Sequence, residues 1–201
     1  MNKRKVLIFD WGGVIAGDNN KIASKILSDK YDLDYNKLYN FICDTENKYL
    51  DVKYESNFFL EIASEFSLSV DEVRNELEKV GPNKEILNLI FKLKKKYDLF
   101  LLSDQITFKS NDIRKKLLPN PFVKMFFSNE LELSKYKSNN IIYDVVLDKI
   151  NSEFDYNSNY EVYFIDNNKT NIKFANKTKI NGILFETFEK LVLDLKKLNI
   201  L

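Results

Sequence analysis

Short apolar runs alternate along the chain with longer stretches in which apolar residues recur at helical spacing. The apolar runs have an aromatic or β-branched centre and are closed by polar residues, which is typical of strands. They occupy residues 5–11, 97–104, 124–131, 161–167 and 182–187. The helical patterns lie at 83–96, 108–118, 139–151, 169–177 and 186–198. Strands that are apolar along their whole length and alternate with helices predict an α/β fold, with a parallel sheet covered on both faces.

The interval 18–81 has a different pattern. It holds no convincing strand, and its helical patterns lie at 20–30, 34–50, 55–66 and 69–80. Ser69, followed three residues later by Glu72, is typical of a helix start. Gly-Pro-Asn at 81–83 ends the interval, and the strand–helix alternation begins there. We therefore expect an α/β core made of residues 1–17 and 82–201, and an inserted all-α, four-helix cap made of residues 18–81.

Composition narrows the possible partners. The 201 residues are 44% hydrophobic, which is enough apolar material for one large core. The 31 basic and 30 acidic residues nearly cancel, so charge gives no reason to expect a nucleic acid or an anionic membrane as partner. No apolar stretch reaches the length of a transmembrane helix, and a single cysteine cannot form an intrachain disulfide. We expect a cytoplasmic protein, monomeric or homodimeric, that binds a small molecule.

The chain contains no histidine, which limits its possible chemistry. Hydrolases of the Ser-His-Asp or Cys-His type, His general bases and nearly all His-ligated zinc or iron sites are excluded. Any catalysis has to use carboxylates, lysine, hydroxyls, backbone groups or a cation bound by oxygen atoms.

Polar residues suited to phosphate chemistry follow four of the five predicted strands: Asp10, Ser103, Lys135 and Asp166. In open α/β sheets, ligands bind outside the carboxyl ends of the strands, so these side chains are expected to meet at one edge. Asp10 is the candidate nucleophile, and Asp10 and Asp166 could hold Mg²⁺, which prefers one or two carboxylates together with water and phosphate oxygens. Ser103 and Lys135 would hold the non-bridging phosphate oxygens.

The residues beside these positions are the candidates for substrate binding. Gly12 and Gly13 let the backbone approach a phosphate closely, where a Cβ atom would obstruct it. Trp11, Gly13, Asp104 and Asn167 are the predicted substrate-binding residues. Trp11 has an alternative reading as a core residue, because a large aromatic side chain beside a strand is more often buried than in contact with a ligand.

Four segments in this order resemble the haloacid dehalogenase-like hydrolases, a superfamily of hydrolases with an aspartyl nucleophile and a Rossmann-like core. "IFDWGGVI" is similar to the first family motif, "FLLSDQ" to the second, "ELSK" to the lysine motif and "VYFIDNNKTNIKFA" to the acidic fourth motif. The resemblance spans residues 5 to about 187, and the helical insert stands where subfamily I has its helical cap. It implies a Mg²⁺-dependent phosphatase that works through an aspartyl-phosphate.

The first motif departs from the usual family pattern, Asp-x-Asp. Asp10 matches the nucleophile, whereas Gly12 stands where the second Asp serves as general acid and base. The resemblance gives that position a metal ligand through its backbone carbonyl, which Gly12 keeps. The proton donor is lost, and general acid catalysis is typically worth about 10²- to 10⁴-fold in rate. A substrate hydroxyl, a bound water or Asp104 could replace it.

Three functional hypotheses follow. The first is a phosphatase for a small phosphorylated metabolite, a sugar phosphate or similar, whose leaving group needs little protonation. The second is a haloacid dehalogenase, since a halide leaves without a proton. The third is a catalytically impaired protein with a binding or regulatory role. The joint presence of Asp10, Ser103, Lys135 and Asp166 favours the first.

Overall fold

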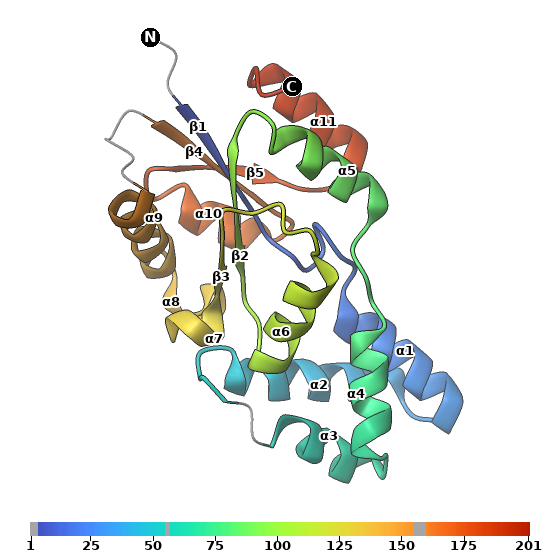
Figure 1. Cartoon of the computed structure of the whole chain (residues 1–201). Helices are drawn as coiled ribbons and strands as arrows, with labels where there is room; N and C mark the ends of the chain where they lie inside the picture. The colour runs from blue at the N-terminus through green and yellow to red at the C-terminus, as the bar shows by residue number, and fades with distance from the viewer. Residues whose placement is uncertain (1–3, 55–56, 155–159) are drawn as a thin grey trace.

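The computed structural model describes residues 4–54, 57–154 and 160–201. Five parallel strands form one sheet in the order β3-β2-β1-β4-β5 (Figure 1). The strands are β1 (Arg4–Phe9), β2 (Asp98–Ser103), β3 (Lys124–Phe127), β4 (Tyr160–Asp166) and β5 (Ile180–Leu184). The predicted parallel sheet is confirmed, with all five strands at the expected places.

Helices cover both faces of this sheet. They are α5 (Lys84–Leu93), α6 (Thr107–Lys116), α7 (Ser128–Leu131), α8 (Lys135–Ser138), α9 (Ile141–Phe154), α10 (Lys169–Ala175) and α11 (Phe188–Lys197). Along β1, Leu7 and Phe9 point to a cluster formed with α5, α6 and α11, while Val6 and Ile8 point to one formed with α9 and α10. Successive side chains of a strand alternate between the faces, so a strand buried on both sides has to be apolar throughout.

The expected strand at 124–131 is too long. The strand β3 ends at Phe127, and the next four residues form the short helix α7. Glu132 ends that helix in the left-handed conformation, with φ of 55°. The apolar run alone could not reveal this change, because Phe127 and Leu131 suit a buried strand and a buried helix equally well.

The insert forms a helical layer at one end of the sheet (Figure 1). Its helices are α1 (Asn19–Tyr31), α2 (Tyr35–Tyr49), α3 (Phe58–Phe66) and α4 (Val70–Glu78). The expected helix 55–66 begins at two residues that lie outside the described part, and its remainder is α3. The capping box predicted at Ser69 and Glu72 is present.

The insert has its own apolar cluster, which draws on all four of its helices and includes Ile106 from the start of α6. The chain leaves and re-enters the α/β unit at neighbouring points, since Ala16 bridges to Pro82 and the Asn83 amide donates to the Ile15 carbonyl at 2.7 Å. No helix in the described part of the chain is long and apolar enough to cross a membrane.

Candidate active site

The four polar residues predicted to meet do so at the carboxyl edge of the sheet. Asp10 directly follows β1, Ser103 ends β2 and Asp166 ends β4. Lys135 is the first residue of α8, so it reaches the site from a short helix and not from a strand end. All four are buried, with exposed fractions of 7%, 1%, 0% and 4% for Asp10, Ser103, Asp166 and Lys135. Buried charges of this kind persist only when they are paired.

Lys135 pairs with both acids. Its Nζ lies 2.9 Å from Asp10 Oδ1 and 3.0 Å from Asp166 Oδ2. Burial by itself would lower the pKa of this ammonium, but the carboxylates of Asp10, Asp166 and Asp104 outweigh burial and hold the pKa above its usual range. Lys135 is therefore a permanent cation at the point where the two acids meet.

The Asp10 carboxyl has a raised pKa. Burial raises its pKa to about 6, Lys135 and the Ser103 hydroxyl oppose that change, and Asp166 adds to it. The Trp11 amide donates to Asp10 Oδ1 at 2.7 Å, which fixes the side chain's direction. A buried carboxylate held by one cation and one amide is a plausible nucleophile, because little of it is hydrated.

Asp166 is held from its own loop and helix. Its Oδ1 accepts the Asn168 amide at 2.6 Å, and its Oδ2 accepts the Asn171 side chain at 2.9 Å. Asn171 lies in the segment that resembles the acidic fourth motif, and its side-chain amide supports this carboxylate.

Asp104 anchors the helix that carries Lys135. Its two carboxylate oxygens accept the backbone amides of Lys135 and Tyr136 at 2.8 and 3.0 Å. Burial raises the pKa of Asp104, while Lys135 and the two amides oppose the rise. These contacts favour a positioning role for Asp104 over that of a proton donor, because both oxygens are already acceptors.

The Gly12–Gly13 turn differs at its two positions. Gly13 has φ of 75°, a conformation that strains any other residue, and a Cβ built on it would also lie 2.3 Å from Asn167 Nδ2. A Cβ at Gly12 would meet nothing within 4 Å. Gly12 thus leaves open space where a larger side chain would fit.

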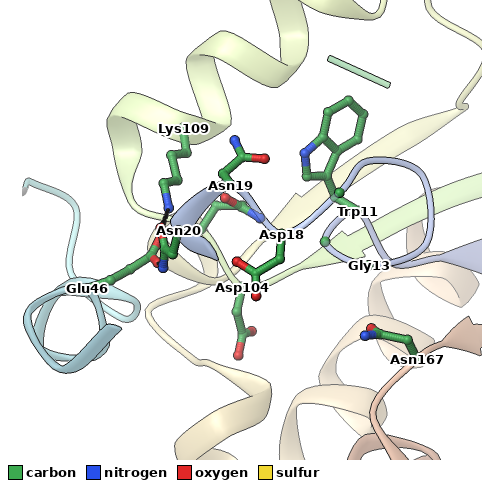
Figure 2. Close-up of a pocket in the computed structure, with 12 residues that line it drawn as sticks. Trp11, Gly13, Asp18, Asn19, Asn20, Glu46, Asp104, Lys109 and Asn167 are labelled. Atoms are coloured by element: carbon green, nitrogen blue, oxygen red, sulfur yellow. Dashed lines mark hydrogen bonds and ion pairs between the residues drawn. The ribbon is translucent and has the colours of Figure 1, made fainter. Parts of the chain in front are cut away.

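A cavity of about 240 Å³ lies beside the Gly12–Gly13 turn and Asn167 (Figure 2). Its lining comes from the loops after the strands, the insert and α6: Trp11, Gly12, Gly13, Gly17, Asp18, Asn19, Asn20, Glu46, Asp104, Gln105, Lys109 and Asn167. All four predicted substrate-binding residues are among them. Trp11 is only 3% exposed and also belongs to the apolar cluster on the α5 face, so it contributes to both.

One wall of the cavity is a polar network that the sequence did not indicate. Lys109 Nζ donates to Asn20 Oδ1 at 2.7 Å and to Glu46 Oε1 at 2.6 Å, and the Asn20 amide donates to Glu46 Oε2 at 2.5 Å. Each of the three residues is at most 9% exposed. They come from α6, α1 and α2, so the network joins the insert to the α/β unit.

Solved structures with the same architecture are known. The HAD family enzyme BT-2542 from Bacteroides thetaiotaomicron superposes with a TM-score of 0.69 at 19% identity, over 95% of this chain and 99% of that one. The chain has the HAD fold. The same enzyme in complex with magnesium and inorganic phosphate gives a TM-score of 0.66 at 19% identity, over 94% and 98% of the two chains. A dehalogenase with an intermediate complex gives 0.68 at 15% identity, over 92% and 86%. No protein-family model matches the sequence, and no curated protein matches it.

The donor groups at the edge of this HAD fold suit Mg²⁺. No group of three or more His, Cys, Asp or Glu side chains in the described residues could hold a metal by itself. Mg²⁺ needs only one or two carboxylates, completed by water and phosphate oxygens. Asp10 and Asp166 both reach the same Lys135 nitrogen, and with Asp104 they place three acids around one cation. This excess of negative charge fits a divalent cation.

Another residue that the sequence did not indicate lies behind the site. The Tyr143 hydroxyl, on α9, is buried and has no hydrogen-bond partner among the described residues. Burial raises its pKa above the usual range, while Lys135 opposes the rise. In the sequence Tyr143 is one aromatic residue of an ordinary amphipathic helix, so only the packing of α9 against β4 places it there.

Proposed function

We propose that this protein is a HAD-type hydrolase, a Mg²⁺-dependent phosphatase that acts on a small phosphorylated metabolite through an aspartyl-phosphate intermediate. The observation that carries the proposal is the Lys135 ammonium, which contacts the carboxylates of Asp10 and Asp166 at one buried point on the carboxyl edge of the sheet. Two acids, one fixed cation and the Ser103 hydroxyl make a set that can bind and transfer a phosphoryl group.

In the proposed reaction, a carboxylate oxygen of Asp10 attacks phosphorus. The bond from phosphorus to the leaving oxygen breaks with its electron pair, and that oxygen takes a proton from solvent or from the substrate itself. Water then attacks the phosphorus of the aspartyl-phosphate, which releases inorganic phosphate and restores Asp10. Lys135 and Ser103 hold the non-bridging oxygens and offset their charge in both steps.

Asp10, Asp166 and the Gly12 carbonyl would hold Mg²⁺. When bound, the cation supplies charge neutralisation that lets an anionic phosphate approach an anionic carboxylate. Asp104 would be a positioning residue. It accepts the Lys135 and Tyr136 backbone amides at the start of α8 and so fixes where the Lys135 ammonium lies.

Gly12 shapes the choice of substrate. It brings no proton donor, so leaving groups that need little protonation, such as anomeric sugar phosphates, acyl phosphates or aryl phosphates, would react best. The insert would act as a cap over the cavity, and a cavity of about 240 Å³ suits a small metabolite. The substrate side of the site would include Trp11, Gly13 and Asn167.

The deciding experiment is hydrolysis of p-nitrophenyl phosphate, with Mg²⁺ or with EDTA, by the wild type and by Asp10→Asn. Its leaving group needs almost no protonation, so the missing donor matters least there. We expect turnover that requires Mg²⁺ and falls by more than about 10³-fold in Asp10→Asn. Turnover equal to that of the folded variant would contradict the proposal. Chloride release from a 2-haloacid would then indicate a dehalogenase, and its absence a binding role.

A further inference from the structure

The network of Asn20, Glu46 and Lys109 occupies one side of the cavity, and Asn167 lies on the other side (Figure 2). The Gly12–Gly13 turn belongs with Asn167, because Gly13 lies directly against its side chain. A phosphate held at the turn would therefore extend its organic part toward the network. The network is the part of the wall that this organic group would contact.

The network keeps hydrogen-bonding capacity after its internal contacts are made. An ammonium has three N–H groups, and Lys109 Nζ gives one to Asn20 and one to Glu46. A carboxylate accepts at about four positions, and Glu46 receives one bond from Lys109 and one from Asn20. An ammonium next to a carboxylate offers a donor and an acceptor side by side. A hydroxyl group, which donates and accepts, fits that pair.

The charged residues that line the cavity disfavour a substrate with a second anionic group. Asp18, Glu46 and Asp104 line the cavity, and Lys109 is the only Lys or Arg among the described lining residues. Lys109 is already paired with Glu46 at 2.6 Å. A second phosphate or a carboxylate on the leaving group would face acids with no free cation to balance it.

We propose that Glu46 and Lys109 are specificity-determining residues that bind hydroxyls of the leaving group, with Asn20 holding the pair in place. The site then selects a polyhydroxylated monophosphate over an apolar one and over a bisphosphate. This inference rests on the proposed phosphatase function and names the substrate class of that same site.

The test compares kcat/KM for three substrates: glucose 1-phosphate, phenyl phosphate and glucose 1,6-bisphosphate. For Glu46→Gln, which keeps the side chain's size, and for Lys109→Met, we expect kcat/KM on glucose 1-phosphate to fall about 10- to 100-fold. On phenyl phosphate, which has no hydroxyls, the fall is expected to stay within about threefold. Lys115→Met, an exposed position on the same helix as Lys109, is the matched control and is expected to change neither ratio. The wild type is expected to prefer the monophosphate to the bisphosphate by at least about tenfold.

The two proposals fail in distinguishable ways. If the wild type hydrolyses phenyl phosphate but the variants lose activity equally on both monophosphates, or lose none, the phosphatase stands and the specificity role is wrong. A bisphosphate hydrolysed as well as the monophosphate overturns the charge part of the inference. If the folded wild type hydrolyses none of the three, the proposed function fails and this inference fails with it.

Discussion

Two regions of the site are built differently: the set of Asp10, Asp104, Lys135 and Asp166 at the carboxyl edge of the sheet, here called the strand side, and the Asn20, Glu46 and Lys109 wall of the cavity, here called the insert side. On the strand side, three acids surround the single cation Lys135, and every group follows a strand or opens a short helix. On the insert side, one acid meets one cation: Glu46 lies in the last turn of α2, and Lys109 lies in the first turn of α6. The strand side has an excess of negative charge, whereas the Glu46–Lys109 pair on the insert side has no net charge.

This difference separates two tasks. A site with excess negative charge and a fixed ammonium suits the binding of a divalent cation and phosphate oxygens, and the sheet edge holds its parts rigidly. A pair of opposite charges has no net charge that would attract a phosphate, and it can bind neutral polar groups through hydrogen bonds. The insert side also depends on how α1, α2 and α6 meet, so it can change without disturbing the strand side.

The largest effect on stability is expected from removing the cation of the strand side. Lys135→Met removes the cation shared by Asp10 and Asp166 and leaves two buried carboxylates unpaired, which costs about 3–5 kcal/mol. Without Lys135 the pKa of Asp10 rises further, because Lys135 lowers it in the wild type. One acid then stays protonated at low pH, so the loss is expected to be larger at pH 8 than at pH 5.5. Denaturant unfolding at both values measures it.

The matched control is Lys137→Met on the same short helix. Lys137 pairs with Asp51 at 2.6 Å, but its side chain is 42% exposed. Exposed pairs contribute about 0–1 kcal/mol, so this variant is expected to lose little stability at either pH. A similar loss in both variants would show that the buried position of Lys135 has no special role.

A proton donor can be added to the strand side at Gly12. Gly12 lines the cavity, and a Cβ there meets nothing within 4 Å, so Gly12→Asp fits sterically. We expect its kcat on an alkyl phosphate, relative to p-nitrophenyl phosphate, to rise at least about tenfold. Gly12→Ala, which adds the Cβ without the acid, is expected to leave this ratio unchanged. Equal effects of the two variants would mean that protonation of the leaving group does not limit the reaction.

The sequence predicted the strand side better than the insert side, for a physical reason. Asp10, Ser103 and Asp166 follow apolar runs, and the parallel sheet brings the ends of such runs to one edge, so local pattern determines their meeting. Lys135 was expected four residues past the predicted strand 124–131; the strand ends already at Phe127, the next residues form α7, and Lys135 opens α8.

No local pattern indicates Asn20, Glu46 or Lys109. Each is one polar residue on an amphipathic helix, and Lys109 is one of 31 basic residues in the chain. Their burial depends on three helices that meet from distant parts of the sequence, and helical periodicity does not encode that arrangement. Tyr143 was not predicted for the same reason, because its burial depends on how α9 packs against β4.

The smallest expected effect concerns the cost of keeping Asp10 ionised. Burial raises its pKa to about 6 in the folded protein, against 3.8 in the unfolded chain, so the folded state binds more protons than the unfolded state between these two pH values. The contribution of Asp10 to the free energy of unfolding is fully present below pH 3.8 and is lost as the pH rises through 6. Asn at this position gives up the ion pair with Lys135 but stays neutral at every pH, so its stability has no such pH-dependent loss, and Lys135 keeps Asp166 as partner. In EDTA, Asp10→Asn is therefore expected to unfold at a higher temperature than the wild type at pH 7.5.

That difference is expected to disappear as the pH falls below 3.8, where Asp10 is protonated in both states. Asp29→Asn, an exposed position paired with Lys25, is the control and is expected to show no such pH dependence. Mg²⁺ should raise the unfolding temperature of the wild type more than that of Asp10→Asn, because the cation would stabilise the ionised carboxylate. A wild type more stable than Asp10→Asn at pH 7.5 in EDTA would mean that Lys135 alone compensates the buried charge of Asp10. The ionised carboxylate would then need no Mg²⁺ to stabilise it.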